Sequence, residues 1–279
     1  MFVSLKEEPM ATWTTGSCEA NGINIHYLRT GGDKPAVILL HGLMTNGACW
    51  SSLAQALEQD CDVIMPDSRG HGCSSAPLED YSYDTLARDV LGLIVALGLS
   101  SAVLIGHSMG GMTAAVAASR SPKQVRGLVL AEPTFLSPQR QIEVYESDVA
   151  AQHRRILNGT KEDFLTEMRM RYSHRVSDLI ELLVQARFQT SMHAFEVLRP
   201  PNPDYRELIK TLRMPGLLVM GDVGAVVSAE VVLELSQLNQ CLEIVQIAEA
   251  GHGLPYDQPE RFSCVVKNFL RLRFKSISP

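Results

Sequence analysis

The chain has 279 residues, of which 46% are hydrophobic, and a formal net charge of −6 at pH 7. This length and apolar content suit one α/β domain with an insertion, and the mild, dispersed charge argues against a nucleic-acid partner. The six cysteines are scattered and form no CxxC pair, which fits a reducing compartment. The first residues lack the apolar core of a signal peptide. The longest apolar run, 90–99, is too short to span a bilayer. We expect a cytoplasmic protein without a membrane partner and leave its oligomeric state open.

Strand-like segments recur along the chain. Residues 12–30 predict an antiparallel hairpin that turns at Asn21 and Gly22. Helical segments such as 83–97 and 109–120 separate later runs of branched apolar residues. These runs predict strands buried on both faces, at 36–40, 62–66, 102–106, 127–131, 216–220 and 242–247. The alternation predicts a doubly wound, mostly parallel sheet covered by helices.

One long interval, between the strands ending at 131 and beginning at 216, breaks this alternation. Phe164, Met168 and Tyr172 recur there at helical spacing, and Leu183 belongs to a second apolar stripe. We interpret residues 135–205 as a helical cap inserted into a core formed by residues 12–134 and 206–275. Phe164, Met168 and Leu183 are our candidates for cap side chains that cover the substrate.

The strongest local signal is GHSMG, which places Ser108 directly after a predicted strand and directly before a helix of small residues. G-x-S-x-G in this setting predicts a nucleophile elbow, a sharp turn that exposes the serine Oγ. The flanking glycines avoid clashes with neighbouring backbone, and the N-terminus of the helix favours developing negative charge. Ser108 is therefore the candidate nucleophile.

Together with GHSMG, three further stretches resemble motifs of the α/β-hydrolase superfamily: HGLMTNG (41–47), DSRGHGCS (67–74) and AGHGLPYDQPERF (250–262). The resemblance covers about residues 20–272 and implies that family's eight-stranded sheet. It also implies an oxyanion hole made by the backbone N–H groups of Leu43 and Met109, and neither a metal nor an organic cofactor. The Met44 side chain, next to Leu43, is a candidate for shaping the acyl pocket, with simple packing as an equal alternative.

The catalytic base has to be chosen among eight histidines. His252 lies in a glycine-flanked loop just past the last predicted strand, at the sheet edge where α/β active sites gather. It also follows the serine in the chain order expected of this fold. The remaining histidines fit structural or surface roles, so we predict that His252 is the general base.

The acid that orients the histidine is not where superfamily members commonly carry it, because Gly224 occupies that position after the strand 216–220. Asp222 lies close by but early in the turn. Glu132 ends the strand 127–131, which a right-handed βαβ unit places beside the Ser108 strand. Zearalenone-type lactonases and (acetamidomethylene)succinate hydrolases also take their acid from this strand, and AEPT resembles their pattern. We favour Glu132 over Asp222, although Glu132 could instead only cap the entrance to the insertion.

These assignments predict a serine hydrolase that forms an acyl-enzyme from an ester or lactone of a small, mostly apolar substrate. Hydrolysis of an amide or a C–C bond, and cofactor-free dioxygenation, are alternatives on the same fold. A small-ligand receptor is the non-enzymatic alternative, which turnover would distinguish from an enzyme.

Overall fold

A single eight-stranded sheet organises the computed structural model, which describes residues 13–274. The strand order is β1-β2-β4-β3-β5-β6-β7-β8. The strands are β1 (Thr14–Ala20), β2 (Ile23–Arg29), β3 (Ala36–Leu40), β4 (Asp62–Pro66), β5 (Ala102–His107), β6 (Val125–Ala131), β7 (Gly216–Met220) and β8 (Leu242–Gln246). Strands β3 to β8 pair in parallel and the first two pair antiparallel, which confirms the predicted doubly wound, mostly parallel sheet.

The antiparallel hairpin turns where the sequence predicts it. Asn21 and Gly22 both have positive φ, 48° and 77°, as a two-residue turn that matches the twist of its strands requires. The predicted core limits at residues 12 and 275, and the N-terminal stretch inspected for a signal peptide, lie outside the described residues. The division between core and cap stays a prediction.

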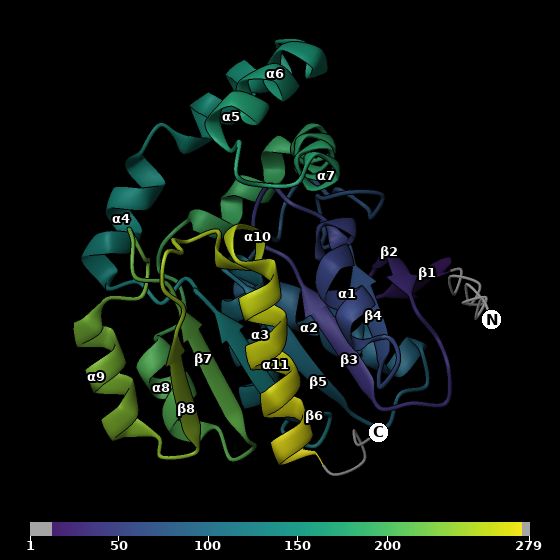
Figure 1. Ribbon diagram of the computed structural model, residues 1–279, viewed down its shortest axis with the longest axis vertical. Coiled ribbons are helices and arrows are strands. Elements are labelled where there is room, and N and C mark those ends of the chain that lie inside the picture. The colour runs from purple at the N-terminus through teal and green to yellow at the C-terminus, as the bar shows by residue number, and fades with distance from the viewer. Residues whose placement is uncertain (1–12, 275–279) are drawn as a thin grey trace, which may run out of the picture.

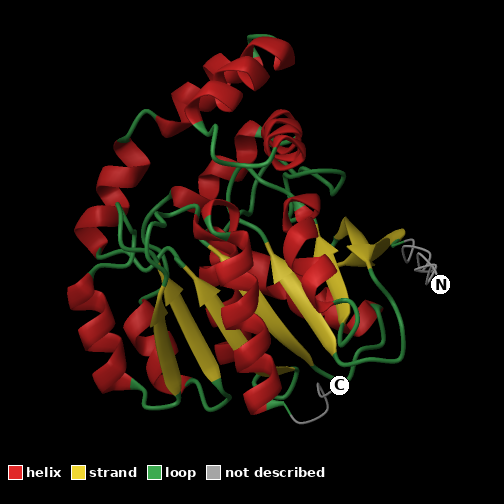
Figure 2. Cartoon of the chain, in the orientation of Figure 1, coloured by secondary structure: helices red, strands yellow, loops and turns green. Residues whose placement is uncertain are grey.

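Helices cover both faces of the sheet (Figures 1 and 2). One face packs against α2 (Tyr83–Ala96), α3 (Met109–Arg120), α8 (Tyr205–Thr211) and α9 (Ala229–Leu238), and the other against α1 (Ser51–Leu57) and α11 (Pro259–Arg273). Because β3, β4, β5 and β7 have neighbours above and below, their side chains are buried on both faces, as the uninterrupted apolar runs predict, whereas the outer strands β1 and β8 are partly exposed.

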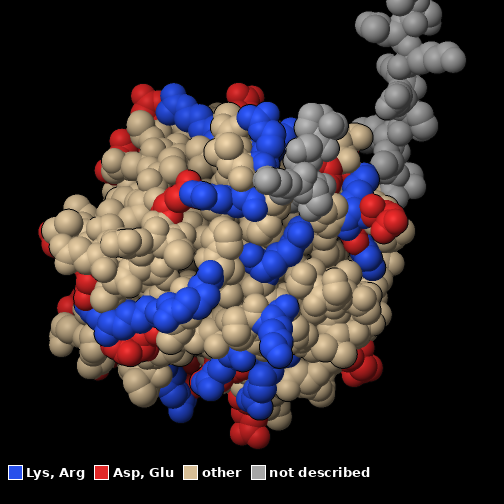
Figure 3. All heavy atoms as spheres, turned by 90° about the horizontal axis from the view of Figure 1, so that it is seen from below, with Lys and Arg blue, Asp and Glu red and all other residues tan. Residues whose placement is uncertain are grey.

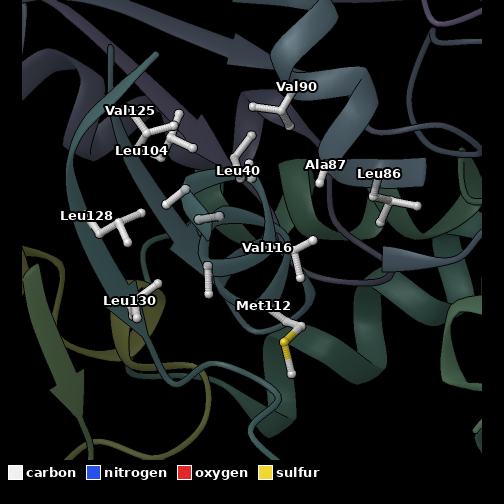
Figure 4. Packing of buried hydrophobic residues seen from close by; sticks show 14 of the residues in the cluster. Leu40, Leu86, Ala87, Val90, Leu104, Met112, Val116, Val125, Leu128 and Leu130 are labelled. Carbon is white, nitrogen blue, oxygen red and sulfur yellow. The ribbon is translucent and has the colours of Figure 1, made fainter. Parts of the chain in front are cut away.

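The core beside α2 and α3 fixes the start of the helix that follows Ser108. Leu104, Leu128 and Leu130 of the sheet face Met112 and Val116 of α3 in one buried cluster (Figure 4). The side chains of Met112 and Leu104 are fully buried. Helix α3 is therefore held against the sheet along its length, and its first turn has little freedom to move.

The interval between β6 and β7 is helical. It contains α4 (Pro138–Glu146), α5 (Val149–Leu157), α6 (Lys161–Arg171), α7 (Ser177–Phe188) and the 3₁₀ segment η2 (Met192–Leu198). Figure 1 shows α5, α6 and α7 beyond the carboxyl ends of the parallel strands. Among residues 13–274, no helix has both the length and the apolar character needed to cross a bilayer.

The opposite end of the molecule, seen from below, carries Lys and Arg side chains spread among uncharged residues, with Asp and Glu beside several of them (Figure 3). A binding site is expected at the other end of the sheet, beneath the inserted helices, because loops from the carboxyl ends of several strands converge there.

Candidate active site

Ser108 occupies the sharp turn between β5 and α3. Its backbone has φ 54° and ψ −118°, a left-handed conformation that a residue with a side chain rarely adopts. A Cβ at Gly106 would collide with the Gly110 backbone, and a Cβ at Gly110 would collide with the carbonyl of Leu40. The two motif glycines thus let the strand and helix approach closely enough to hold Ser108 in this turn.

His252 lies within hydrogen-bonding distance of Ser108, although the two residues are far apart in sequence. Its Nε2 is 3.0 Å from the Ser108 Oγ. The loop between β8 and α10 (Leu254–Asp257) carries His252, and the His107 Nε2–H donates to the His252 carbonyl oxygen over 2.6 Å. The neighbour of the serine thereby holds the backbone of the histidine in place.

Glu132 follows the last residue of β6 and points its carboxylate toward the other ring nitrogen of His252. The Glu132 Oε2 lies 3.7 Å from the His252 Nδ1, which is beyond ordinary hydrogen-bond length. The side chain is fully buried, and its backbone has a positive φ of 44°. The structure therefore places the acid beside the histidine with a contact that has to shorten before it becomes a hydrogen bond.

The loop after β7 surrounds the Glu132 carboxylate with backbone donors. Gly221 N–H donates to Oε1 over 2.9 Å, and Val226 N–H and Val227 N–H donate to Oε2 over 2.6 and 3.4 Å. Burial raises the pKa of the Glu132 carboxyl. The proximity of His252 and the N–H groups of Gly221 and Val226 lower this pKa by a larger amount, so the net shift is downward. Glu132 is thus held as an ionised carboxylate.

Asp222, the alternative acid, has a different position. It is exposed, and its Oδ1 accepts a hydrogen bond from Ala250 N–H over 3.2 Å, while its own N–H donates to the Ala250 carbonyl over 2.9 Å. These bonds fasten the β7 loop to the loop that carries His252. Gly224 has φ +60°, and a Cβ there would meet nothing within 4 Å.

Two backbone N–H groups beside the serine are available to an incoming oxygen. Within residues 13–274, no protein acceptor takes a hydrogen bond from the Leu43 or the Met109 N–H. Met109 is the first residue of α3, and Leu43 follows Gly42, where a Cβ would be 3.2 Å from the Ser108 Cβ. Both predicted oxyanion donors therefore lie next to the serine turn without an internal partner.

Three motif histidines are buried and neutral. Burial lowers the pKa of His41 to about 4 and the pKa values of His71 and His107 to about 3. His41 Nε2 accepts from Ser68 N–H over 2.9 Å, and His71 Nε2 accepts from Met44 N–H over 3.3 Å. The His41 bond links the start of the Leu43 loop to the loop after β4, and the His71 bond holds the Met44 backbone.

A cavity of about 590 Å³ lies between the inserted helices and the loop after β3. It brings together the four predicted substrate-binding residues and one predicted oxyanion residue, namely Met44, Phe164, Met168, Leu183 and Leu43. Neither Ser108 nor His252 is among its lining residues. The cavity thus adjoins the serine turn through the Leu43 loop.

The lining of this cavity is more charged than a mostly apolar substrate requires. Four arginines and two acids contribute to it, namely Arg155, Arg171, Arg175, Arg187, Asp163 and Glu167. The sequence analysis missed them because it counted only the apolar residues of the inserted helices. A signal was present: Arg187 lies one helical turn beyond Leu183, and therefore on the same face of α7.

Comparisons with known proteins agree with the architecture. A family model described as the alpha/beta hydrolase fold matches residues 35–259, so the chain belongs to this family, as its motifs predict. The chain is 30% identical to N-formylmaleamate deformylase of Pseudomonas putida over 94% of its own length and 98% of that protein. It is 27% identical to 2-(acetamidomethylene)succinate hydrolase of Mesorhizobium japonicum, over 87% and 90% of the two chains.

A crystal structure of E-2-(acetamidomethylene)succinate hydrolase superposes with a TM-score of 0.81 at 24% identity, covering 93% of this chain and all of the other. That likeness concerns the fold. The family model and the two sequence relatives confirm the predicted resemblance to this group of hydrolases, whereas the bond that the present chain cleaves is a separate matter.

Proposed function

We propose that the protein is a serine hydrolase that cleaves an acyl bond of a small molecule through a covalent acyl-enzyme. The observation that carries the proposal is the 3.0 Å contact between the Ser108 Oγ and the His252 Nε2, at a strained strand-to-helix turn. A serine hydroxyl is a weak nucleophile until an adjacent base accepts its proton, and this contact supplies that base.

In the first step the Ser108 Oγ attacks the substrate carbonyl carbon while its proton passes to the His252 Nε2. The carbonyl oxygen becomes an oxyanion, which the free N–H groups of Leu43 and Met109 stabilise. His252 then returns the proton to the leaving group, the C–O or C–N bond breaks, and Ser108 is acylated. Water, deprotonated by His252, releases the acid and regenerates the serine.

Glu132 orients the imidazole and stabilises its protonated form in this mechanism. Its carboxylate is ionised and buried, and it lies 3.7 Å from the His252 Nδ1. The attraction strengthens when His252 takes the serine proton, because the ring becomes a cation beside a desolvated anion. We therefore expect the contact to shorten when His252 is protonated, since catalytic hydrogen bonds often tighten only along the reaction.

The bond that we propose first is an ester or a lactone, because attack on an ester carbonyl sacrifices less resonance stabilisation than attack on an amide carbonyl. An N-acyl amide is the second candidate, since a relative at 30% identity is named a deformylase of an N-formyl compound. The proposal also places the protein in the cytoplasm, on the ground that all six cysteines are free thiols.

A fluorophosphonate probe tests the nucleophile. We expect covalent labelling of Ser108, and loss of both labelling and turnover in Ser108→Ala, while the exposed helix serine change Ser236→Ala leaves both intact. Hydrolysis should then be followed over a panel of short esters, lactones and N-formyl amides. Labelling that persists in Ser108→Ala would refute the nucleophile, and stoichiometric labelling without turnover of any panel member would favour the receptor alternative.

A further inference from the structure

Arg187 is a charged group on the wall of the cavity that the mechanism leaves unused. It lies in the last turn of α7, and its guanidinium reaches the side chain of Met44, in the loop that also carries Leu43. Leu43, Met44 and Arg187 line the same cavity. A ligand in this cavity therefore meets the guanidinium and the oxyanion loop together.

The guanidinium of Arg187 has no anionic partner within residues 13–274, and its Nε is buried without a hydrogen-bond acceptor. The other cavity arginines with partners differ from it: Arg175 pairs with Asp257 at 2.6 Å, and Arg155 pairs with Asp148 at 3.3 Å. Burial lowers the pKa of Arg187 to about 10, which still leaves it charged at neutral pH. A buried cation without a partner is costly, and an anion in the cavity would offset that cost.

The arginines of the cavity wall are not equivalent. Asp257 and Asp148 neutralise Arg175 and Arg155, which leaves Arg171 and Arg187 as the lining arginines without an acid partner in the described part of the chain. Arg171 is exposed to solvent, whereas Arg187 is partly buried. Arg187 is therefore the lining cation that gains most from an anion in the cavity.

We propose that Arg187 binds a carboxylate of the substrate, so that the protein prefers acyl compounds which carry a second, free carboxylate. This inference rests on the proposed function and specifies its substrate class. A guanidinium presents parallel N–H donors that match the two oxygens of a carboxylate. Arg187 is therefore a specificity residue, and the carboxylate that it holds positions the reacting carbonyl by the Leu43 loop.

The test compares two methyl esters that differ in one group, monomethyl glutarate and methyl pentanoate, by titrating the acid released at constant pH. We expect the wild-type protein to favour the charged ester, and Arg187→Gln to lower kcat/KM for that ester about 100-fold, mainly through KM, with an effect of about threefold or less on methyl pentanoate. Arg187→Lys should recover part of the preference, since it keeps the charge but not the planar fork.

Arg154→Gln is the matched control, because Arg154 is an exposed arginine of the inserted helices that does not line the cavity. It should change neither ester. Equal losses on both esters in Arg187→Gln, in a variant whose Tm is unchanged, would assign Arg187 a structural role and overturn the inference. So would a wild-type protein without preference between the esters.

Calorimetric titration of the Ser108→Ala protein with glutarate separates this inference from the proposed function. Binding that is lost in the Ser108→Ala/Arg187→Gln protein supports the carboxylate site even if no ester is turned over. Turnover of methyl pentanoate together with absent glutarate binding would retain the hydrolase and reject the carboxylate site.

Discussion

Replacing Glu132 by glutamine removes the charge beside His252 while keeping nearly the same shape. The buried carboxylate accepts three backbone N–H groups and lies 3.7 Å from the His252 Nδ1. The amide has one accepting oxygen, so its NH₂ group must face either a backbone donor or the imidazole. We expect a loss of about 1–3 kcal/mol in the free energy of unfolding from the mismatched donors.

The effect on catalysis should be larger than the effect on stability. The corresponding acid-to-amide change in a serine protease lowers kcat about 10⁴-fold, and the longer contact here suggests a loss of about 10²- to 10⁴-fold. This loss corresponds to about 3–5 kcal/mol of transition-state stabilisation. The assay is kcat on the best ester of the panel, measured well below the Tm of each variant.

Asp222→Asn is the matched acid-to-amide control. The Asp222 Oδ1 accepts only the Ala250 N–H, a role that an asparagine oxygen can keep, so we expect a loss of about tenfold or less in kcat. If Asp222→Asn proved the more damaging of the two, Glu132 would be a buried structural acid and our assignment would be wrong. Mild effects of both changes would show that neither carboxylate alone orients His252.

Two further predictions concern the fold around the site. Gly110→Ala should lower the free energy of unfolding by at least about 3 kcal/mol, because its Cβ would collide with the last carbonyl of β3. Gly159→Ala is the control, since its Cβ would have ordinary contacts, and it should leave the urea midpoint nearly unchanged. The free energy of unfolding should also fall between pH 7 and pH 5. His41, His71 and His107 have folded pKa values of about 3 to 4, below the value in the unfolded chain, so the unfolded chain binds more protons in this pH range. Each histidine should therefore lower the free energy of unfolding by about 2 kcal/mol at pH 5. A flat urea-midpoint profile over that range would contradict the buried neutral histidines.

The sequence was most informative where one physical requirement dominates. Strands buried on both faces need uninterrupted apolar runs, and these runs predict β3, β4 and β7 with the bounds that the structure shows. The serine turn needs glycines at fixed spacing, which gives it a readable motif. Both requirements are local, so a short stretch of chain suffices to express them.

The charged wall of the cavity was harder to predict because it depends on how separate helices meet. Glu167 follows Phe164 by three residues and Arg187 follows Leu183 by four, so each shares a helical face with a predicted apolar residue. Periodicity alone does not say whether such a charge snorkels to solvent or faces a cavity. Only the packing of α6 and α7 over the Leu43 loop decides that.

The contacts of Glu132 show what the β7 loop contributes to the site although it has no acid at residue 224. Gly224 has a φ of +60°, a conformation in which a side chain is strained, and a Cβ there would meet nothing within 4 Å. The loop instead turns its Gly221 and Val226 N–H groups toward the carboxylate that arrives from β6. The residue after β6 thus supplies the carboxylate, and the β7 loop supplies hydrogen bonds that favour its ionised form. Because these donors are backbone groups, we expect side-chain substitutions in the loop to be tolerated as long as its path is kept, whereas our assignment predicts that Glu132 cannot be replaced.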